Sequence, residues 1–387
     1  MNTITRTDEL AQFCEIAKSA PYVTVDTEFL RERTYWSKLC LIQLALPQAG
    51  GSETGQAVLV DPLSEELSLD PLYDLFRHTA TVKVFHAARQ DLEIFHHDAG
   101  IFPTPLFDTQ VAAMVCGFGE QVGYETLVRK IARANLDKSS RFTDWSRRPL
   151  SPAQAAYALA DVTHLRQIYE FLSAELAKTG REAWLAEELA VLTNPETYIT
   201  RPEDAWRKVR TRTNSPRFLA ILRELARFRE TYAQERDIPR SRVFKDDAMI
   251  ELASTKPQTE ADLGRSRLLL REARRGEVAN GILAAVKAGL ETQDLPKPKP
   301  EEPGRPGNAA LSELLRVLLK AKADAAGVAP KLIASSAELD AIATGMRDVP
   351  ALKGWRAEVF GRDALRLAEG EIALSAKGGA VKVVPVP

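Results

Sequence analysis

Two carboxylates near the start of the chain have the spacing of paired metal ligands. Asp26 and Glu28 lie in the largely apolar run Tyr22–Leu30, which has the length and composition of a strand. Because side chains alternate across a strand, these two carboxylates project from the same face. Two like charges held this close disfavour each other's ionisation unless a cation lies between them. The pair therefore predicts a divalent metal site, and the alternative is an ordinary strand with a solvated acidic edge.

Two later stretches place further acidic residues on helices. His86–Phe95 has helical spacing, so Asp91 falls in the first turn or two of a helix, where the helix dipole stabilises a negative charge. The segment Pro152–Leu165 begins with a proline suited to a helix N-terminus, and it carries Tyr157 and Asp161 one turn apart on the same face. Taken alone, this pair is better explained as two side chains that satisfy one another at the surface.

The elements around these acidic residues alternate between strand and helix. Helical periodicity and apolar runs of strand length predict, in chain order, a helix at 7–19, strands at 39–46 and 57–61, a helix near 70–78, and strands at 82–85 and 106–109. The three successive strands ending at residue 61 suggest a meander. Alternation of this kind implies a mixed sheet covered by helices.

Length and composition describe a protein of two or three domains. The chain has 387 residues, of which 45% are hydrophobic and 27% charged. No apolar run approaches the roughly 20 residues of a membrane helix, and the N-terminus lacks the pattern of a secretion signal. Cys14, Cys40 and Cys116 are odd in number and scattered, which favours a reducing compartment and argues against a zinc knuckle. We therefore expect a cytoplasmic monomer with no membrane partner.

Charge is distributed unevenly along the chain. Residues 1–200 contain 18 Lys and Arg against 27 Asp and Glu, whereas residues 201–290 contain 20 against 13. A basic block beside an acidic first half predicts a surface for a polyanion next to a site that concentrates carboxylates. A solvated helical face would have the same composition, so this alternative stays open.

The acidic motifs resemble those of the DEDD superfamily of 3′–5′ exonucleases, in its tyrosine-bearing branch. The three motifs are Asp26 with Glu28, Asp91 after His86, and Tyr157 with Asp161, and they occur in the family's order. Further segments extend the resemblance to the bacterial ribonuclease D family over essentially the whole chain; they are residues 26–36, 41–44, 107–110, 136–139 and 143–150. The resemblance implies an α/β N-terminal domain with a ribonuclease H-like mixed sheet and flanking helices.

The resemblance also implies a two-metal hydrolysis of phosphodiesters. Two divalent cations, Mg²⁺ or Mn²⁺, activate a water and neutralise charge on the scissile phosphate, and both prefer oxygen ligands. Asp26, Glu28 and Asp161 would hold the metal that activates water, and Asp26 with Asp91 would bind the second. Tyr157 would orient or deprotonate the attacking water.

Candidates for RNA contacts lie near these motifs. The aromatic side chains of Phe29, Tyr35 and Trp36 could stack on terminal bases or simply pack at a strand end. The polar side chains of Gln110 and Lys138 could contact the sugar or the phosphate. His86 could support the site from a strand end, although a core histidine is the stronger interpretation. Asp108 lies outside the motif positions and is left out of the metal set.

Composition shifts divide the chain into four regions. We expect a catalytic domain at 1–195, a helical HRDC domain at 205–290, a proline-rich linker at 291–308, and a second HRDC-like helical domain at 309–387 that ends in a hairpin. The HRDC assignments rest on resemblance. Arg223, Arg227 and Arg229 could bind the RNA backbone, or the bundle could mainly close a ring around the catalytic domain.

Together these observations predict a ribonuclease D-type 3′–5′ exoribonuclease. It would release nucleoside 5′-monophosphates from the 3′ end of RNA, with trimming of tRNA precursors as the role that the family implies. The alternatives are a DNA-directed 3′–5′ exonuclease and a non-catalytic RNA-binding scaffold. The sequence has neither a Gly-x-Ser-x-Gly elbow nor a His-Glu-x-x-His arrangement, so those hydrolase and zinc peptidase patterns are excluded.

Overall fold

The computed structural model describes residues 3–48, 56–137, 143–213, 215–296 and 309–386. The chain divides into two compact units. Unit 1 comprises residues 1–28, 40–194 and 304–387, and unit 2 comprises residues 29–39 and 195–303. Each unit is therefore assembled from segments that are far apart in the sequence.

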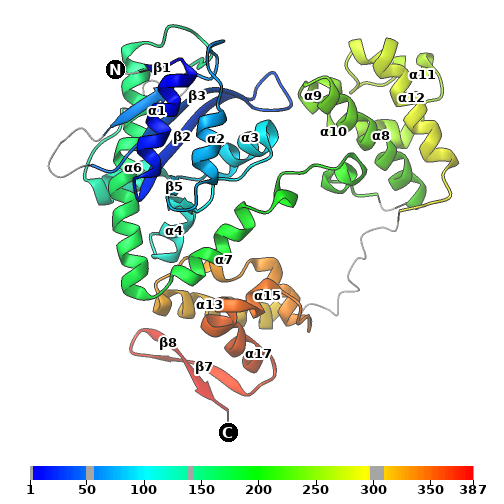
Figure 1. The fold of residues 1–387 in the computed structure, drawn as a ribbon. Coiled ribbons are helices and arrows are strands. Elements are labelled where there is room, and N and C mark those ends of the chain that lie inside the picture. Colours follow the sequence, from blue (N-terminus) through cyan, green and yellow to red (C-terminus); the bar gives the residue numbers. More distant parts are fainter. Residues whose placement is uncertain (1–2, 49–55, 138–142, 214, 297–308, 387) are drawn as a thin grey trace. The chain divides into compact units, whose positions relative to one another are not determined.

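Unit 1 contains a six-stranded mixed sheet with the strand order β1-β4-β3-β2-β5-β6 (Figure 1). Three neighbouring pairs, β1–β4, β2–β5 and β5–β6, are parallel, and β3–β4 is antiparallel. The adjacent strands β2, β3 and β4 form the predicted meander. The strands are β1 (Thr3–Ile4), β2 (Tyr22–Leu30), β3 (Lys38–Ala45), β4 (Ala57–Val60), β5 (Val82–Phe85) and β6 (Leu106–Asp108).

Helices cover both faces of this sheet. Neighbouring residues of a strand point in opposite directions, so one strand contacts the helices on both sides. On β5, Val84 shares a core with Leu165, whereas Phe85 packs edge-on against Phe76 and Phe95. The sheet with flanking helices confirms the predicted fold class. The helices are α1 (Thr7–Lys18), α2 (Asp70–Arg77), α3 (Arg89–Ala99), α4 (Thr109–Val115), α5 (Tyr124–Leu127) with a π-helical continuation Val128–Ala132, α6 (Pro152–Thr179) and α7 (Glu182–Leu192).

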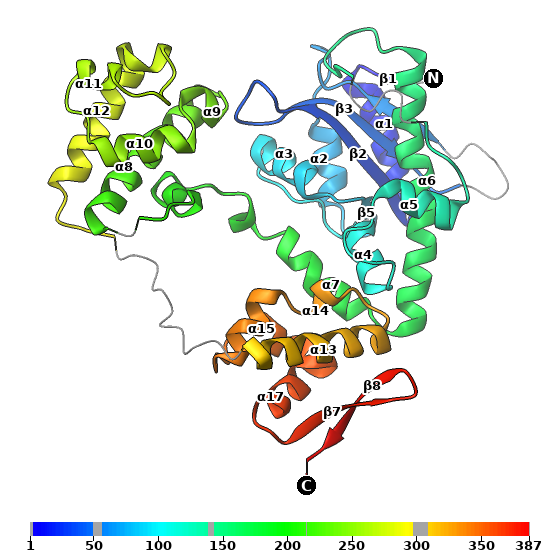
Figure 2. The same ribbon diagram turned by 180° about the vertical axis from the view of Figure 1, so that it is seen from behind.

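The C-terminal helices belong to unit 1 and pack beside α4 and α7 (Figure 2). Trp355 stacks on Trp184 at 4.6 Å between ring centroids, and its indole donates to Glu188 over 3.2 Å. Gly117 lies so close to Gly327 that a Cβ at residue 117 would come 2.3 Å from the Gly327 carbonyl oxygen. The elements are α13 (Ala309–Ala326), α14 (Pro330–Ile333), α15 (Ser336–Ala343), a 3-10 turn Pro350–Leu352, α16 (Gly354–Arg356), a π-helical turn Ala357–Gly361, α17 (Arg362–Ala368), and the hairpin β7 (Ile372–Lys377) and β8 (Ala380–Pro385).

Unit 2 is helical and is organised around α8, which packs closely against α12. At their crossing, a Cβ on Gly289 would come 2.5 Å from the Ile221 Cα, so only glycine allows this approach. The elements are 3-10 helices at Pro195–Thr197, Pro202–Lys208 and Glu272–Arg274, and α8 (Pro216–Glu235), α9 (Arg240–Val243), α10 (Asp246–Thr255), α11 (Glu260–Gly264) and α12 (Gly276–Glu291). Within the described ranges of both units, no helix is long and apolar enough to cross a membrane.

Candidate active site

Strand β2 and helix α6 bring three carboxylates together. Thr24 shares the alternating face of β2 with Asp26 and Glu28, and its hydroxyl donates to the Val162 carbonyl of α6 over 2.9 Å. This bond holds α6 over that face of the strand, and Asp161 is the residue of α6 that precedes Val162. Asp26, Glu28 and Asp161 each offer a carboxylate oxygen, and these oxygens all lie within 4.8 Å of one another.

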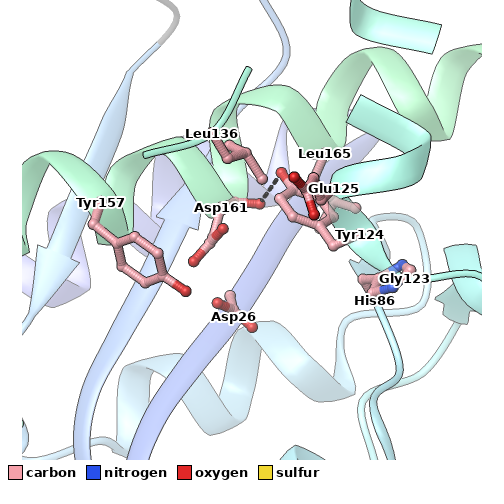
Figure 3. A pocket seen from close by; sticks show the side chains of 9 residues that line it. All are labelled: Asp26, His86, Gly123, Tyr124, Glu125, Leu136, Tyr157, Asp161 and Leu165. Atoms are coloured by element: carbon pink, nitrogen blue, oxygen red, sulfur yellow. Dashed lines mark hydrogen bonds between the residues drawn. The ribbon is translucent and has the colours of Figure 1, made fainter. Parts of the chain in front are cut away.

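Helix α6 begins one turn before Tyr157. Ser151 caps it by accepting from the Gln154 backbone over 3.2 Å, and the Gln154 side chain accepts in return from the Ser151 backbone over 3.0 Å. Trp145 is buried beside Tyr157, with 6.0 Å between ring centroids. Figure 3 shows the Tyr157 hydroxyl pointing toward Asp26 and Asp161. The cap and the Trp145 contact thus set where the phenol lies.

Asp91 is held by the opposite face of the same strand. The Thr27 hydroxyl donates to the Asp91 carboxylate, and Asp91 is only 6% exposed, in the first turn of α3. The charge of Asp91 raises the pKa of both Asp26 and Glu28. Asp91 therefore acts electrostatically on Asp26 and Glu28 from the first turn of α3.

Mutual repulsion and burial make these carboxyl groups hard to ionise. Burial, followed by the charges of Asp161 and Asp91, raises the pKa of Glu28 to about 8. Burial also raises the pKa of Asp91 to about 7, against an opposing hydrogen bond from Thr27. The pKa of Asp26 is raised well above its usual range by burial and by its three acidic neighbours. A cluster with these properties favours either protons or a cation.

The residues present fit a hard divalent cation. The three grouped ligands are all carboxylates, and oxygen is the donor that Mg²⁺ and Mn²⁺ prefer. A cation among them would also compensate the repulsion that raises their pKa values. The family that the motifs resemble depends on divalent metals, and this acidic group is suited to the same dependence.

A pocket with a volume of about 270 Å³ opens beside the acidic residues. Tyr157 lies on one side of Asp26, and His86 and Gly123 lie on the other (Figure 3). The lining residues are Asp26, His86, Gly123, Tyr124, Glu125, Leu136, Tyr157, Asp161 and Leu165. A pocket of this size suits a single small group.

Tyr124 lines the pocket and is hydrogen-bonded to the backbone of Asp161. Its hydroxyl donates to the Asp161 backbone carbonyl over 2.5 Å, and burial raises the pKa of this phenol well above its usual range. Sequence reasoning missed Tyr124 and Glu125, because the short helical segment 124–132 has no motif that connects it with Asp161, and it cited Leu136 only within the resemblance at 136–139. The contact exists only through the fold.

Asp108 supports the turn that precedes α3. It is 1% exposed, and its carboxylate accepts from four backbone N–H groups, those of Ala87, Ala88, Gln110 and Val111, over 2.7 to 3.3 Å. Ala87 has a φ of 57°, a conformation that costs energy for a residue with a Cβ. Asp108 therefore holds the turn between His86 and Asp91.

The weaker candidates occupy other positions. The Gln110 side chain donates to the Val122 carbonyl over 3.2 Å, and Lys138 lies outside the described residues. Phe29, Tyr35 and Trp36 belong to unit 2. There the Tyr35 hydroxyl donates to Glu230, and the backbones of Tyr35 and Trp36 both donate to Asp237 over 2.9 Å. Their contacts with RNA stay predictions.

The three arginines on α8 are engaged in ion pairs within unit 2. Arg223 contacts Glu224 and Asp294, Arg227 contacts Glu224 over 2.6 Å, and Arg229 contacts Asp246 over 2.7 Å. Arg229 is also buried, with 7% of its side chain exposed. Any binding of RNA by these arginines would have to compete with these carboxylates, and it stays a prediction.

Comparison with known proteins gives consistent matches. Residues 1–177 match the profile of the 3′–5′ exonuclease family, and residues 218–286 match the HRDC domain. The chain is 64% identical to ribonuclease D of Jannaschia sp. strain CCS1 over the full length of both proteins. It is 49% identical to ribonuclease D of Granulibacter bethesdensis, covering 98% of this chain and 96% of that protein.

A solved structure agrees with these relatives. The crystal structure of Escherichia coli RNase D, an exoribonuclease involved in structured RNA processing, aligns with a TM-score of 0.82 at 30% identity. The alignment covers 96% of this chain and 99% of that chain. The likeness therefore extends through the helical regions as well as the sheet.

Proposed function

Since this chain belongs to the ribonuclease D family of 3′–5′ exoribonucleases, we propose that it uses two divalent cations and trims the 3′ ends of tRNA precursors. Asp26, Glu28 and Asp161 would hold one cation, and Asp26 with Asp91 would hold the other. When bound, such ions lower the pKa of a water and neutralise charge on the scissile phosphate. Either Mg²⁺ or Mn²⁺ suits these oxygen ligands.

The chain's own residues would orient the reaction. The Tyr157 hydroxyl, which points toward the carboxylates, would accept a hydrogen bond from the attacking water and direct it at the phosphorus. Tyr124 would keep Asp161 in place through its backbone carbonyl. The bond from Thr27 would do the same for Asp91.

The pocket beside the acidic residues would receive the 3′-terminal nucleotide. Its apolar wall, formed by Leu136 and Leu165, would contact the base, and its polar wall would contact the ribose. A volume of about 270 Å³ suits one nucleotide, so we expect the terminal nucleotide to bind there and to leave as a nucleoside 5′-monophosphate.

The observation that carries this proposal is the grouping of Asp26, Glu28 and Asp161 within 4.8 Å. It is tested by Asp26→Asn, which keeps the size of the side chain but removes a charge shared by both proposed metal sites. We expect hydrolysis of a 3′-end RNA substrate to fall at least about 1,000-fold, while RNA binding measured by fluorescence anisotropy stays within about twofold.

The control is Asp74→Asn, because Asp74 is an exposed acidic residue on α2 that pairs with Arg77. It should leave both activity and binding unchanged. Near-normal turnover by Asp26→Asn would show that the metal assignment is wrong.

The substrate is tested with an end-labelled tRNA precursor, incubated with EDTA, Mg²⁺ or Mn²⁺. Stepwise shortening from the 3′ end with a divalent ion supports the proposal. Preference for a DNA strand of the same sequence would favour the alternative of a DNA-directed exonuclease, and binding without shortening would favour a scaffold.

We propose a catalytic domain at 1–195, an HRDC domain at 205–290, a linker at 291–308 and a second HRDC-like domain at 309–387, in a monomer that acts in the cytoplasm. Light scattering of the purified protein tests the monomer, and a mass near twice the 42.8 kDa of the chain would contradict it.

A further inference from the structure

The inference concerns His86, which the proposed chemistry does not use. His86 lines the pocket on the side of Asp26 opposite to Tyr157 (Figure 3). Its ring lies 5.4 Å from that of Tyr124, tilted by 54°. It is partly exposed to the pocket rather than enclosed in the core.

One nitrogen of this ring is committed to the protein. Nδ1 lies 3.0 Å from the hydroxyl of Thr109, and that hydroxyl donates its only hydrogen to the Phe85 carbonyl, also over 3.0 Å. The Thr109 oxygen can therefore only accept from His86, so the proton of the neutral ring lies on Nδ1. This arrangement leaves Nε2 as an unprotonated acceptor.

The surroundings keep the ring neutral. Burial lowers the pKa of His86, and the nearby charge of Asp108 opposes this only in part. The Asp108 carboxylate already accepts from four backbone N–H groups. Among the described residues, no side chain or backbone group is bonded to Nε2, so this acceptor is available to a ligand in the pocket.

Only a donor group on the ligand can pair with such an acceptor. Phosphate oxygens and base carbonyls are acceptors themselves and would be repelled by Nε2. The N–H donors of the bases differ in position from base to base, so they do not offer a donor that every chain end shares. The sugar offers hydroxyl donors at 2′ and 3′, and only the 2′-hydroxyl distinguishes RNA from DNA. A site built to bond a hydroxyl rejects an analogue that lacks it, because its polar group is left unpaired.

We propose that His86 Nε2 accepts a hydrogen bond from the 2′-hydroxyl of the 3′-terminal nucleotide and so selects RNA ends over DNA ends. This rests on the proposed function, because it requires the terminal nucleotide to occupy the pocket beside the acidic residues. His86 is thus a specificity-determining residue, and the turn held by Asp108 and Thr109 positions it.

The test uses one RNA oligonucleotide with three different terminal residues, carrying a 2′-hydroxyl, a 2′-hydrogen or a 2′-fluorine. Release of the terminal nucleotide is followed in single turnover with Mg²⁺. The wild-type enzyme should release the hydroxyl end roughly tenfold faster than the other two, which is the worth of one neutral hydrogen bond. The fluorine end separates the two directions of bonding, because it can accept but cannot donate.

The variant His86→Leu should slow release of the hydroxyl end by roughly tenfold and leave the 2′-hydrogen end within about twofold, so that the preference disappears. His86→Gln, whose amide oxygen can accept, should keep part of the preference. His97→Leu is the matched control, because His97 is an exposed histidine on α3 that does not line the pocket. It should behave as wild type.

Several results would overturn the inference. Equal wild-type rates on hydroxyl and hydrogen ends would do so, and so would a fluorine end that reacts as fast as the hydroxyl end, since Nε2 would then be a donor. A His86→Leu variant that slows all ends equally would reduce His86 to a structural role. In each case metal-dependent release of nucleotides would continue, whereas its complete absence in the wild type would refute the proposed function as well.

Discussion

Glu28→Gln should make the metal-free protein more stable while it removes activity. The substitution keeps the shape of a partly buried side chain and deletes a charge that Asp161 and Asp91 repel. The pKa of Glu28 is about 8 in the folded protein, against a usual value of 4.5. Folding therefore favours the protonated carboxyl, and stability that is present below pH 4.5 is lost as the pH rises toward 8.

The magnitude follows from the two pKa values. At 1.36 kcal/mol per pKa unit, the raised pKa of Glu28 lowers the free energy of unfolding by about 3 kcal/mol at pH 7 and by about 5 kcal/mol at pH 9. At pH 4 the cost is close to zero. The free energy of unfolding of Glu28→Gln should exceed that of the wild type by these amounts, with the difference growing with pH.

Urea denaturation in EDTA at pH 4, 7 and 9 measures this difference. Repeating it in Mg²⁺ should reverse the order at pH 7, because the wild-type cluster gains a cation that stabilises the folded state by mass action. RNA hydrolysis by the variant should fall at least about 100-fold. A difference in stability that does not change with pH, or a variant less stable than wild type at pH 9 in EDTA, would refute the reasoning.

Three further substitutions probe other parts of the fold. Tyr157→Phe should lower kcat about 100-fold without weakening metal binding, measured by steady-state kinetics and by Mn²⁺ titration; unchanged kcat would contradict a role in orienting water. Gly117→Ala, whose Cβ would meet the Gly327 carbonyl, should cost about 1 to 3 kcal/mol and speed proteolysis of the C-terminal helices. Lys83→Met should cost about 3 kcal/mol in urea denaturation, because it strips three backbone carbonyls of their shared donor, whereas the exposed Lys178→Met should cost less than about 0.5 kcal/mol.

The arrangement of the first acidic pair could be predicted from the sequence. Strand alternation alone places Asp26 and Glu28 on one face, and the structure groups them there with Asp161. The predicted strands at 82–85 and 106–109 match β5 and β6 to within a residue, since short apolar runs between turn residues define their ends. The Gly378-Gly379 turn likewise joins β7 and β8 as expected.

The contacts that the sequence did not predict join residues that are far apart in the chain. Thr27 holds Asp91 across 64 positions, and Tyr124 reaches the backbone of Asp161 from a segment without periodicity. Tyr35 was predicted as a surface for bases or as packing at a strand end, and its ring lies under the Arg240 guanidinium at 5.5 Å within unit 2. No local pattern indicates a partner that is some 200 residues away.

Unit 1 is assembled from the first and the last segments of the chain, and this has a consequence for biosynthesis. A single hydrophobic cluster contains Leu165, beside the active site, together with Leu318 and Trp355 from the end of the chain. The ribosome therefore delivers residues 195–303 before the last pieces of this core have been synthesised, and domains generally fold as their residues emerge. We expect a nascent chain that stops after residue 303 to expose this apolar surface and to be cleared by quality control, so that prematurely terminated products do not accumulate as unregulated nucleases.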